Sequence, residues 1–119
     1  MSIEPVDLSF RDDVTARLAP MGAVAHRDMF GGAGMFLDGL MFALVVGRVL
    51  YFKVDDGNRQ DFEDAGTEQF SYMRVFRPAK LSYWRVPDAV LDDADALLAW
   101  GAEAHAVARR VRSKPPAAL

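Results

Sequence analysis

Hydrophobic positions along this chain follow a helical period near both ends and a strand period between them. The first pattern, Phe10, Val14 and Leu18, recurs every four residues and predicts a helix over residues 7–18 with one buried face. The last pattern predicts a long helix over residues 92–112, with acidic residues at its start and arginines at its end, as the helix dipole favours. Its apolar stripe comprises Leu97, Leu98, Gly101, Ala104, Ala108 and Val111.

The middle of the chain is typical of antiparallel hairpins. Asp38-Gly39 is a strong signal for a two-residue turn that needs positive φ, and Gly47-Arg48 suggests a second turn. An extended approach is expected before the first strand, over residues 24–30. The predicted strands span residues 35–37, 40–46, 49–54, 70–76 and 80–86.

A short helix should separate the third and fourth strands. Asn58 predicts its cap and Gly66 its end. Tight turns force antiparallel pairing, so we predict an α+β domain of two layers, with a sheet of about five strands and helices on one face. The strand at 40–46 is apolar on both faces, which indicates that both are covered. We expect residues 1–119 to form a single domain, with a core at about 7–112 and a frayed tail at 113–119.

Composition narrows the class of protein. The 119 residues are 51% hydrophobic, carry a net charge of -3 and include no cysteine, which excludes disulfides and thiolate chemistry. The acidic balance disfavours nucleic-acid binding by bulk charge. The acidic start does not resemble a signal peptide, and the apolar run at 40–46 is too short to cross a bilayer. We therefore expect a cytoplasmic protein with no membrane partner.

The glycine-rich segment could be taken for a phosphate loop and the histidines for metal ligands, but the neighbouring residues support neither kind of site. A phosphate loop would need Lys-Ser or Lys-Thr after its glycines, whereas the glycine-rich residues 31–34 run into Met35 and Phe36, so a bulge or close packing is the preferred interpretation. His26 and His105, even with Asp28 or Glu103, show no metal-ligand spacing. We predict no metal and no cofactor.

A polar turn follows the third strand. Asp55 and Asp56 could pair with Arg59 and, beside Lys53, orient a ligand at the start of the short helix. The preferred alternative is ordinary turn chemistry, because Asp-Asp-Gly-Asn is a common strand-to-helix connection.

Two surfaces are candidates for binding. A candidate interaction face is expected on the apolar side of the sheet that the helices leave open, and it comprises Leu40, Phe42, Leu44, Tyr51 and Lys53. A candidate basic face is expected on the second hairpin, where cations alternate with aromatic residues as in proteins that hold single-stranded nucleic acid. It comprises Arg74, Arg77, Lys80 and Arg85.

An ordered set of motifs resembles the N-terminal domain of the TfoX/Sxy family of bacterial competence regulators. The motifs lie at residues 29–34, 38–45, 50–55, 58–59, 62 and 81–87. The resemblance implies an α-β-β-β-α-β-β-α domain of the secretion-chaperone-like type and a homodimer, and it offers no catalytic residue to transfer. The family's two-domain regulators continue into a helical C-terminal domain, so this chain is expected to be a stand-alone copy.

These patterns together predict a non-enzymatic regulatory or protein-interaction module with no catalytic residue. We expect it to form a homodimer and to bind a protein partner that the sequence does not identify. One alternative is a nucleic-acid-binding domain that uses the basic and aromatic hairpin. The other is a small enzyme or ligand-binding domain, which would need a cleft with a perturbed acid, base or nucleophile.

Overall fold

The computed structural model describes residues 6–29, 31–74 and 77–113, with the side chains of 71–81 and 112–113 outside the described set. The predicted helices and strands occur in the predicted order, and three further segments, at residues 19–21, 25–29 and 88–91, were not predicted as helices or strands. The helical segments are α1 (Leu8–Leu18), η1 (Ala19–Met21), α2 (Arg59–Asp64), α3 (Asp88–Leu91) and α4 (Ala94–Ser113). The strands are β1 (Ala25–Met29), β2 (Gly32–Leu37), β3 (Leu40–Val46), β4 (Val49–Lys53), β5 (Gln69–Arg74) and β6 (Arg77–Arg85).

The described strands form one antiparallel sheet of six strands in the order β1-β2-β3-β4-β6-β5. The turn at Asp38 and Gly39 has φ values of +55° and +76°, which is the conformation predicted for a two-residue hairpin. The α+β prediction is therefore confirmed, with one strand more than the five expected. That strand is β1, which the sequence pattern indicated only as an extended approach, because its exposed polar residues show no apolar alternation.

A β-bulge in β3 places residues of its predicted apolar face on opposite sides of the sheet. Met35 pairs with Ala43 and Phe36 pairs with Met41, so Phe42 is the extra residue in β3. Phe42 and Ala43 are consecutive, yet both are fully buried in the core beneath the helices. Strict alternation therefore fails at this point of the strand.

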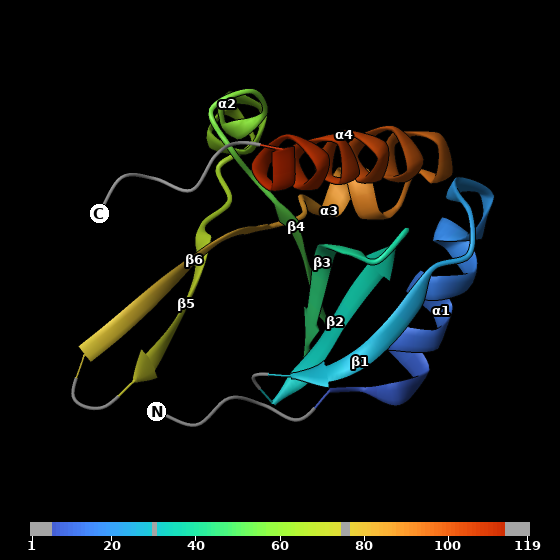
Figure 1. Cartoon of the computed structure of the whole chain (residues 1–119), viewed down its shortest axis with the longest axis horizontal. Coiled ribbons are helices and arrows are strands. Elements are labelled where there is room, and N and C mark those ends of the chain that lie inside the picture. Colours follow the sequence, from blue (N-terminus) through green and yellow to red (C-terminus); the bar gives the residue numbers. More distant parts are fainter. Residues whose placement is uncertain (1–5, 30, 75–76, 114–119) are drawn as a thin grey trace.

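The main core lies between the sheet and the helical layer (Figure 1). Phe10, Val14 and Leu18 of α1 are all buried there, as their spacing predicts, and Asp7 caps the helix by accepting a hydrogen bond from the Phe10 N–H. Gly101 of α4 permits a close approach to the chain around it. A Cβ at that position would lie 3.1 Å from the Met21 sulfur and 3.5 Å from the Phe52 ring.

The opposite side of the sheet carries a second, smaller cluster. Leu44, Phe70 and Tyr83 are buried there, with Met41, Val46 and Tyr51 packed around them. No helical residue of the described chain belongs to this cluster. We call this side of the sheet the outer face.

The hairpin of β5 and β6 projects beyond the end of β4 (Figure 1). Only residues 83–85 of β6 pair with β4. The predicted strands 70–76 and 80–86 leave Arg77, Pro78 and Ala79 as a connection between them, which is wrong, because all three residues belong to β6 and Arg77 pairs with Arg74. Proline is tolerated in this strand because β6 has a partner on only one side there.

Within the described part of the chain, no helix combines the length and apolar character that crossing a bilayer requires.

Candidate interaction surface and its supporting turn

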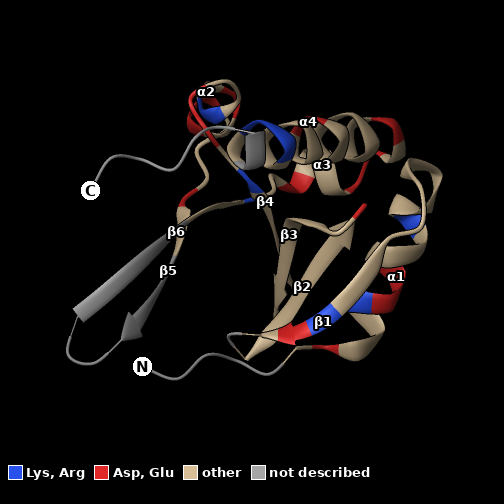
Figure 2. Cartoon of the chain, in the orientation of Figure 1, with Lys and Arg blue, Asp and Glu red and all other residues tan. Residues whose placement is uncertain are grey.

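The outer face is built from side chains that strand pairing aligns across the sheet. Directly paired residues of antiparallel strands point to the same side, so the register alone defines its rows. One such row crosses five strands and comprises Arg27, Gly34, Leu44, Tyr51 and Arg85. Lys53 and Tyr83 form a second pair on this side. The centre of the surface is uncharged, because β2 and β3 contain no charged residue (Figure 2).

Part of the outer face is closed by the chain itself. Leu44, Phe70 and Tyr83 are 0%, 5% and 6% exposed. The Tyr83 hydroxyl donates a hydrogen bond of 3.3 Å to the Met41 carbonyl oxygen, so this ring from β6 reaches past β4 to β3. Burial raises the pKa of Tyr83 well above its usual range, because the phenolate would lose its hydration. Phe36, Met41, Val46 and Tyr51 remain partly accessible around this closed centre.

Cations lie against aromatic rings at the margins of the outer face. The Arg27 guanidinium is 4.7 Å from the centroid of the Phe36 ring, and the Lys53 ammonium is 4.9 Å from that of Tyr83. Burial lowers the pKa of Lys53, although the charge of Asp55 opposes the shift.

Arg85 lies in the same margin and is paired within the chain. Its Nε donates to the Glu68 carboxylate at 2.7 Å, and this hydrogen bond raises the pKa of Arg85. Since Arg85 is already paired, it contributes less net positive charge to the margin than Arg27 and Lys53 do.

The residues predicted for the interaction face do not share one side of the sheet. The bulge turns Phe42 toward the helices, and Leu40 packs against the same core. Leu44 lies on the outer face but is fully buried, so Tyr51 and Lys53 are the two with accessible atoms there. Phe36 and Met41 were missed because the extra residue in β3 cannot be located by alternation.

Of the predicted basic face, the structure describes one side chain. Arg85 is partly buried on the outer face and pairs with Glu68. The remaining side chains lie outside the described residues, although their backbones belong to β5 and β6. They are Arg74, Arg77 and Lys80.

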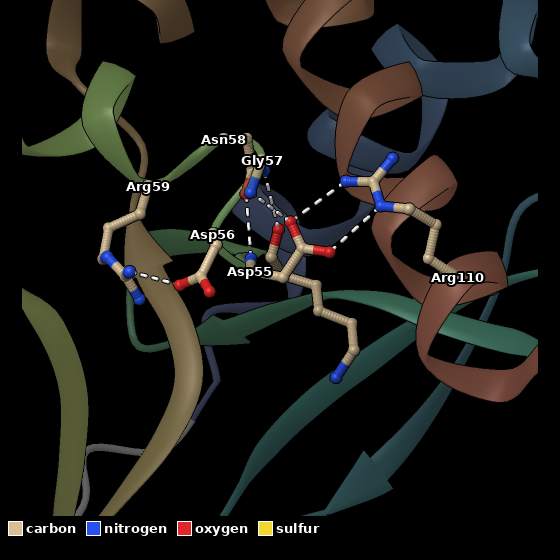
Figure 3. A network of polar contacts seen from close by, with 7 residues as sticks. Asp55, Asp56, Gly57, Asn58, Arg59 and Arg110 are labelled. Carbon is tan, nitrogen blue, oxygen red and sulfur yellow. Dashed lines mark hydrogen bonds and ion pairs between the residues drawn. The ribbon is translucent and has the colours of Figure 1, made fainter. Parts of the chain in front are cut away.

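The polar turn after β4 forms a closed network (Figure 3). Both carboxylate oxygens of Asp55 accept from Arg110 of α4, each at 3.0 Å, and one of them also accepts from the Gly57 N–H. The hydrogen bonds to Asp55 raise the pKa of the Arg110 guanidinium. Asp56 pairs separately with Arg59. Turn chemistry thus accounts for these acidic residues, and it ties the end of the sheet to α4.

Asn58 holds this turn from within. Its side chain is buried, with Oδ1 accepting from the Asp55 N–H at 2.9 Å and Nδ2 donating to the Lys53 carbonyl oxygen at 3.1 Å. It occupies the N-cap position of α2 as predicted, yet makes no side-chain capping bond to that helix. The amide serves the strand end and the turn instead.

The buried histidine also has a structural explanation. His105 Nδ1 accepts from Arg109 at 2.8 Å, since a guanidinium can only donate, and Nε2 therefore donates to the Leu37 carbonyl oxygen at 3.0 Å. His26 is exposed on β1 and takes no part in these hydrogen bonds. In the described part of the chain, no three His, Cys, Asp or Glu side chains are grouped as metal ligands would be.

The glycine-rich segment is part of β2 and its approach, and its glycines allow close packing. A Cβ at Gly32 would lie 2.1 Å from the Val45 carbonyl oxygen, and one at Gly34 would lie 2.9 Å from the Met29 sulfur. The bulge or close-packing interpretation therefore describes these positions better than a phosphate loop.

A single antiparallel sheet, helices on one side and a partly open apolar surface on the other define a class of small α+β domains. The model of the TfoX N-terminal domain matches residues 16–108, and the chain belongs to that family. It is also similar to the DNA transformation protein TfoX1 of Aliivibrio fischeri (strain ATCC 700601 / ES114), with 32% identity over 68 residues. This match covers 57% of the chain and 32% of the relative, so it spans about a third of that protein.

Proposed function

We propose that this chain is a non-catalytic regulatory module of the TfoX type, which acts by binding through its outer face. One observation carries the proposal: Phe36, Met41, Val46 and Tyr51 keep accessible apolar surface on a side of the sheet that no described helix covers. Apolar atoms gathered in this way are typical of interaction surfaces. By extension from the relative named for DNA transformation, the module would regulate that process.

The occupant that fits this surface best is a second copy of the chain. A two-fold contact brings the same patch of each copy together, so its centre must be complementary to itself. The centre here is uncharged and apolar, and Arg27 and Lys53 lie at its margins on β1 and β4. Two such surfaces can therefore meet without bringing like charges to the axis.

Sedimentation velocity at about 1 to 200 µM tests this dimer, a range that detects micromolar affinities. Val46→Lys places an ammonium on the outer face, and Val111→Lys makes the same change at a position of α4 that is 46% exposed. The long lysine stem lets both variants keep the fold. Wild type and Val111→Lys should form the dimer and Val46→Lys should not. A wild-type monomer throughout, or equal behaviour of the two variants, would exclude the proposal.

A nucleic-acid strand is the second candidate for the same face. The observation that favours it is the placement of Arg27 over Phe36 and of Lys53 over Tyr83, since cations beside rings hold unpaired bases. Fluorescence anisotropy with a single-stranded oligonucleotide would then show salt-sensitive binding that Lys53→Gln weakens and Arg59→Gln, on α2, leaves unchanged. No binding at low salt would end this alternative.

A further inference from the structure

A cavity of about 200 Å³ lies between α2 and α4, away from the outer face. Pockets for drug-sized ligands are usually larger, about 300–1,000 Å³, so this one suits a single side chain better than a nucleotide or a cofactor. Its lining combines aromatic and acidic residues with the buried amide of the turn. The lining residues are Asn58, Asp61, Phe62, Ala99, Trp100 and Glu103.

Two aromatic rings form the apolar wall of the cavity. Phe62 of α2 and Trp100 of α4 meet edge to face, with their ring centroids 4.8 Å apart. Phe62 is fully buried, whereas Trp100 is only partly buried and borders the opening. The face of an indole ring attracts cations more strongly than that of any other side chain.

Two carboxylates stand beside the rings. Asp61 and Glu103 are exposed, and neither carboxylate makes a hydrogen bond or a direct ion pair with any residue that the structure describes, although the charge of Glu103 interacts with that of Arg110. The nearby cation Arg110 is held by both oxygens of Asp55, so it attracts Glu103 from a distance and forms no direct ion pair with either carboxylate of the cavity. An apolar wall with two available negative charges is complementary to a cationic group on an aliphatic stem.

The surroundings favour the same kind of ligand. The helix α2 contains Asp61, Glu63 and Asp64 against Arg59, whereas α4 carries Arg109 and Arg110 near its C-terminal end (Figure 2). The acidic surface of α2 attracts basic partners. The network of Asn58 and Asp55 fixes the start of α2, so the wall is in place before a ligand arrives.

We propose that this cavity receives one arginine or lysine side chain from a basic segment of a partner protein. The cationic end lies between the carboxylates of Asp61 and Glu103, and its aliphatic stem packs on Trp100. The site uses α2 and α4 only, so it is independent of the dimer proposed for the outer face.

NMR titration with the blocked peptide Ala-Ala-Arg-Ala-Ala tests the proposal, because one inserted side chain gives weak, millimolar affinity that NMR still measures. The peptide should shift the Trp100 indole N–H signal, and the same peptide with glutamine in place of arginine should not. Neutralising the site with Asp61→Asn and Glu103→Gln should weaken binding about tenfold, as two partly exposed ion pairs allow.

A matched control changes the net charge equally at other exposed positions of the helical layer. Glu63→Gln with Asp92→Asn should leave the affinity within about twofold of wild type, because neither residue lines the cavity. The proposal fails if the arginine peptide leaves the Trp100 signal unmoved, or if the control pair weakens binding as much as the cavity pair. It also fails if spermidine, a free polyamine, shifts the signal at lower concentration than the peptide.

Discussion

Replacing Asn58 by alanine should destabilise the domain more than its position in a surface turn would indicate. The side chain is 3% exposed and bonds one backbone donor, the Asp55 N–H, and one acceptor, the Lys53 carbonyl oxygen. Alanine makes neither hydrogen bond, so the Asp55 N–H and the Lys53 carbonyl oxygen both lose their bond to residue 58 in a partly buried turn. The loss acts where β4, α2 and α4 meet (Figure 3).

The magnitude follows from the two orphaned groups. A buried backbone group left without a partner costs about 1–3 kcal/mol. Because these two groups are only partly buried, the lower part of that range, about 1–2 kcal/mol each, applies, and Asn58→Ala should lower the free energy of unfolding by about 2–4 kcal/mol. A domain of 119 residues unfolds with an entropy of about 0.25 kcal/mol/K, and the expected fall in Tm is therefore roughly 8–16 °C.

Urea denaturation followed by circular dichroism measures this loss, with Gln60→Ala as the matched control. Gln60 lies on α2 and is exposed, and among the described residues its amide bonds the Asp64 carboxylate alone, so its truncation should cost less than about 0.5 kcal/mol. If Asn58→Ala costs less than about 1 kcal/mol, or no more than the control, the buried amide does not hold the turn.

A second substitution at the same position separates the donor from the acceptor. In Asn58→Asp the introduced carboxylate still accepts from the Asp55 N–H but has no proton for the Lys53 carbonyl oxygen. Burial would raise the pKa of that carboxyl, so its destabilising effect should be full at neutral pH and should shrink as the pH falls. A difference from wild type that does not depend on pH would contradict the assigned hydrogen bonds.

Three further predictions concern packing and pH. Gly32→Ala should prevent stable folding, seen as loss of cooperative unfolding, because its Cβ would lie 2.1 Å from the Val45 carbonyl oxygen. Tyr83→Phe should cost about 1 kcal/mol in urea denaturation, because the Met41 carbonyl oxygen loses its donor. The pKa of Asp7 is lowered, mainly by the capping hydrogen bond from the Phe10 N–H in the first turn of α1 and next by the hydrogen bond from Arg48. The ionised carboxylate therefore stabilises the fold above the usual aspartate pKa, and this stabilisation is lost as the pH falls through the lower pKa of the folded state. The stability gap between wild type and Asp7→Ala should therefore be wider at about pH 6 than at about pH 3.

The fold was largely predictable because its strongest signals are local. Asp38-Gly39 requires one turn geometry and so determines a hairpin, and the spacing of Phe10, Val14 and Leu18 defines the buried face of α1 without any knowledge of its partner. By contrast, β1 has no apolar alternation, since its residues are mostly exposed at the edge of the sheet. What makes β1 a strand is its pairing with β2, and this pairing leaves no pattern in the sequence of β1.

The candidate surface was only partly predictable, because it depends on contacts between distant segments. The bulge at Phe42 reverses which residues of β3 point outward, and no sequence signal locates it. Tyr83 covers part of the outer face through a hydrogen bond to Met41, a residue 42 positions away. Asn58 was recognised as a cap, but its actual partners lie behind it in the chain.

An isotope-filtered NOE experiment on a mixed dimer tests the central proposal most directly. One copy carries labelled methionine methyl groups, and the other is unlabelled. The account predicts contacts between copies from the Met41 methyl group to the rings of Phe36 and Tyr51 on the outer face. Contacts confined to the helices, such as those around Val111, or the absence of any contact between copies at high concentration, would contradict it.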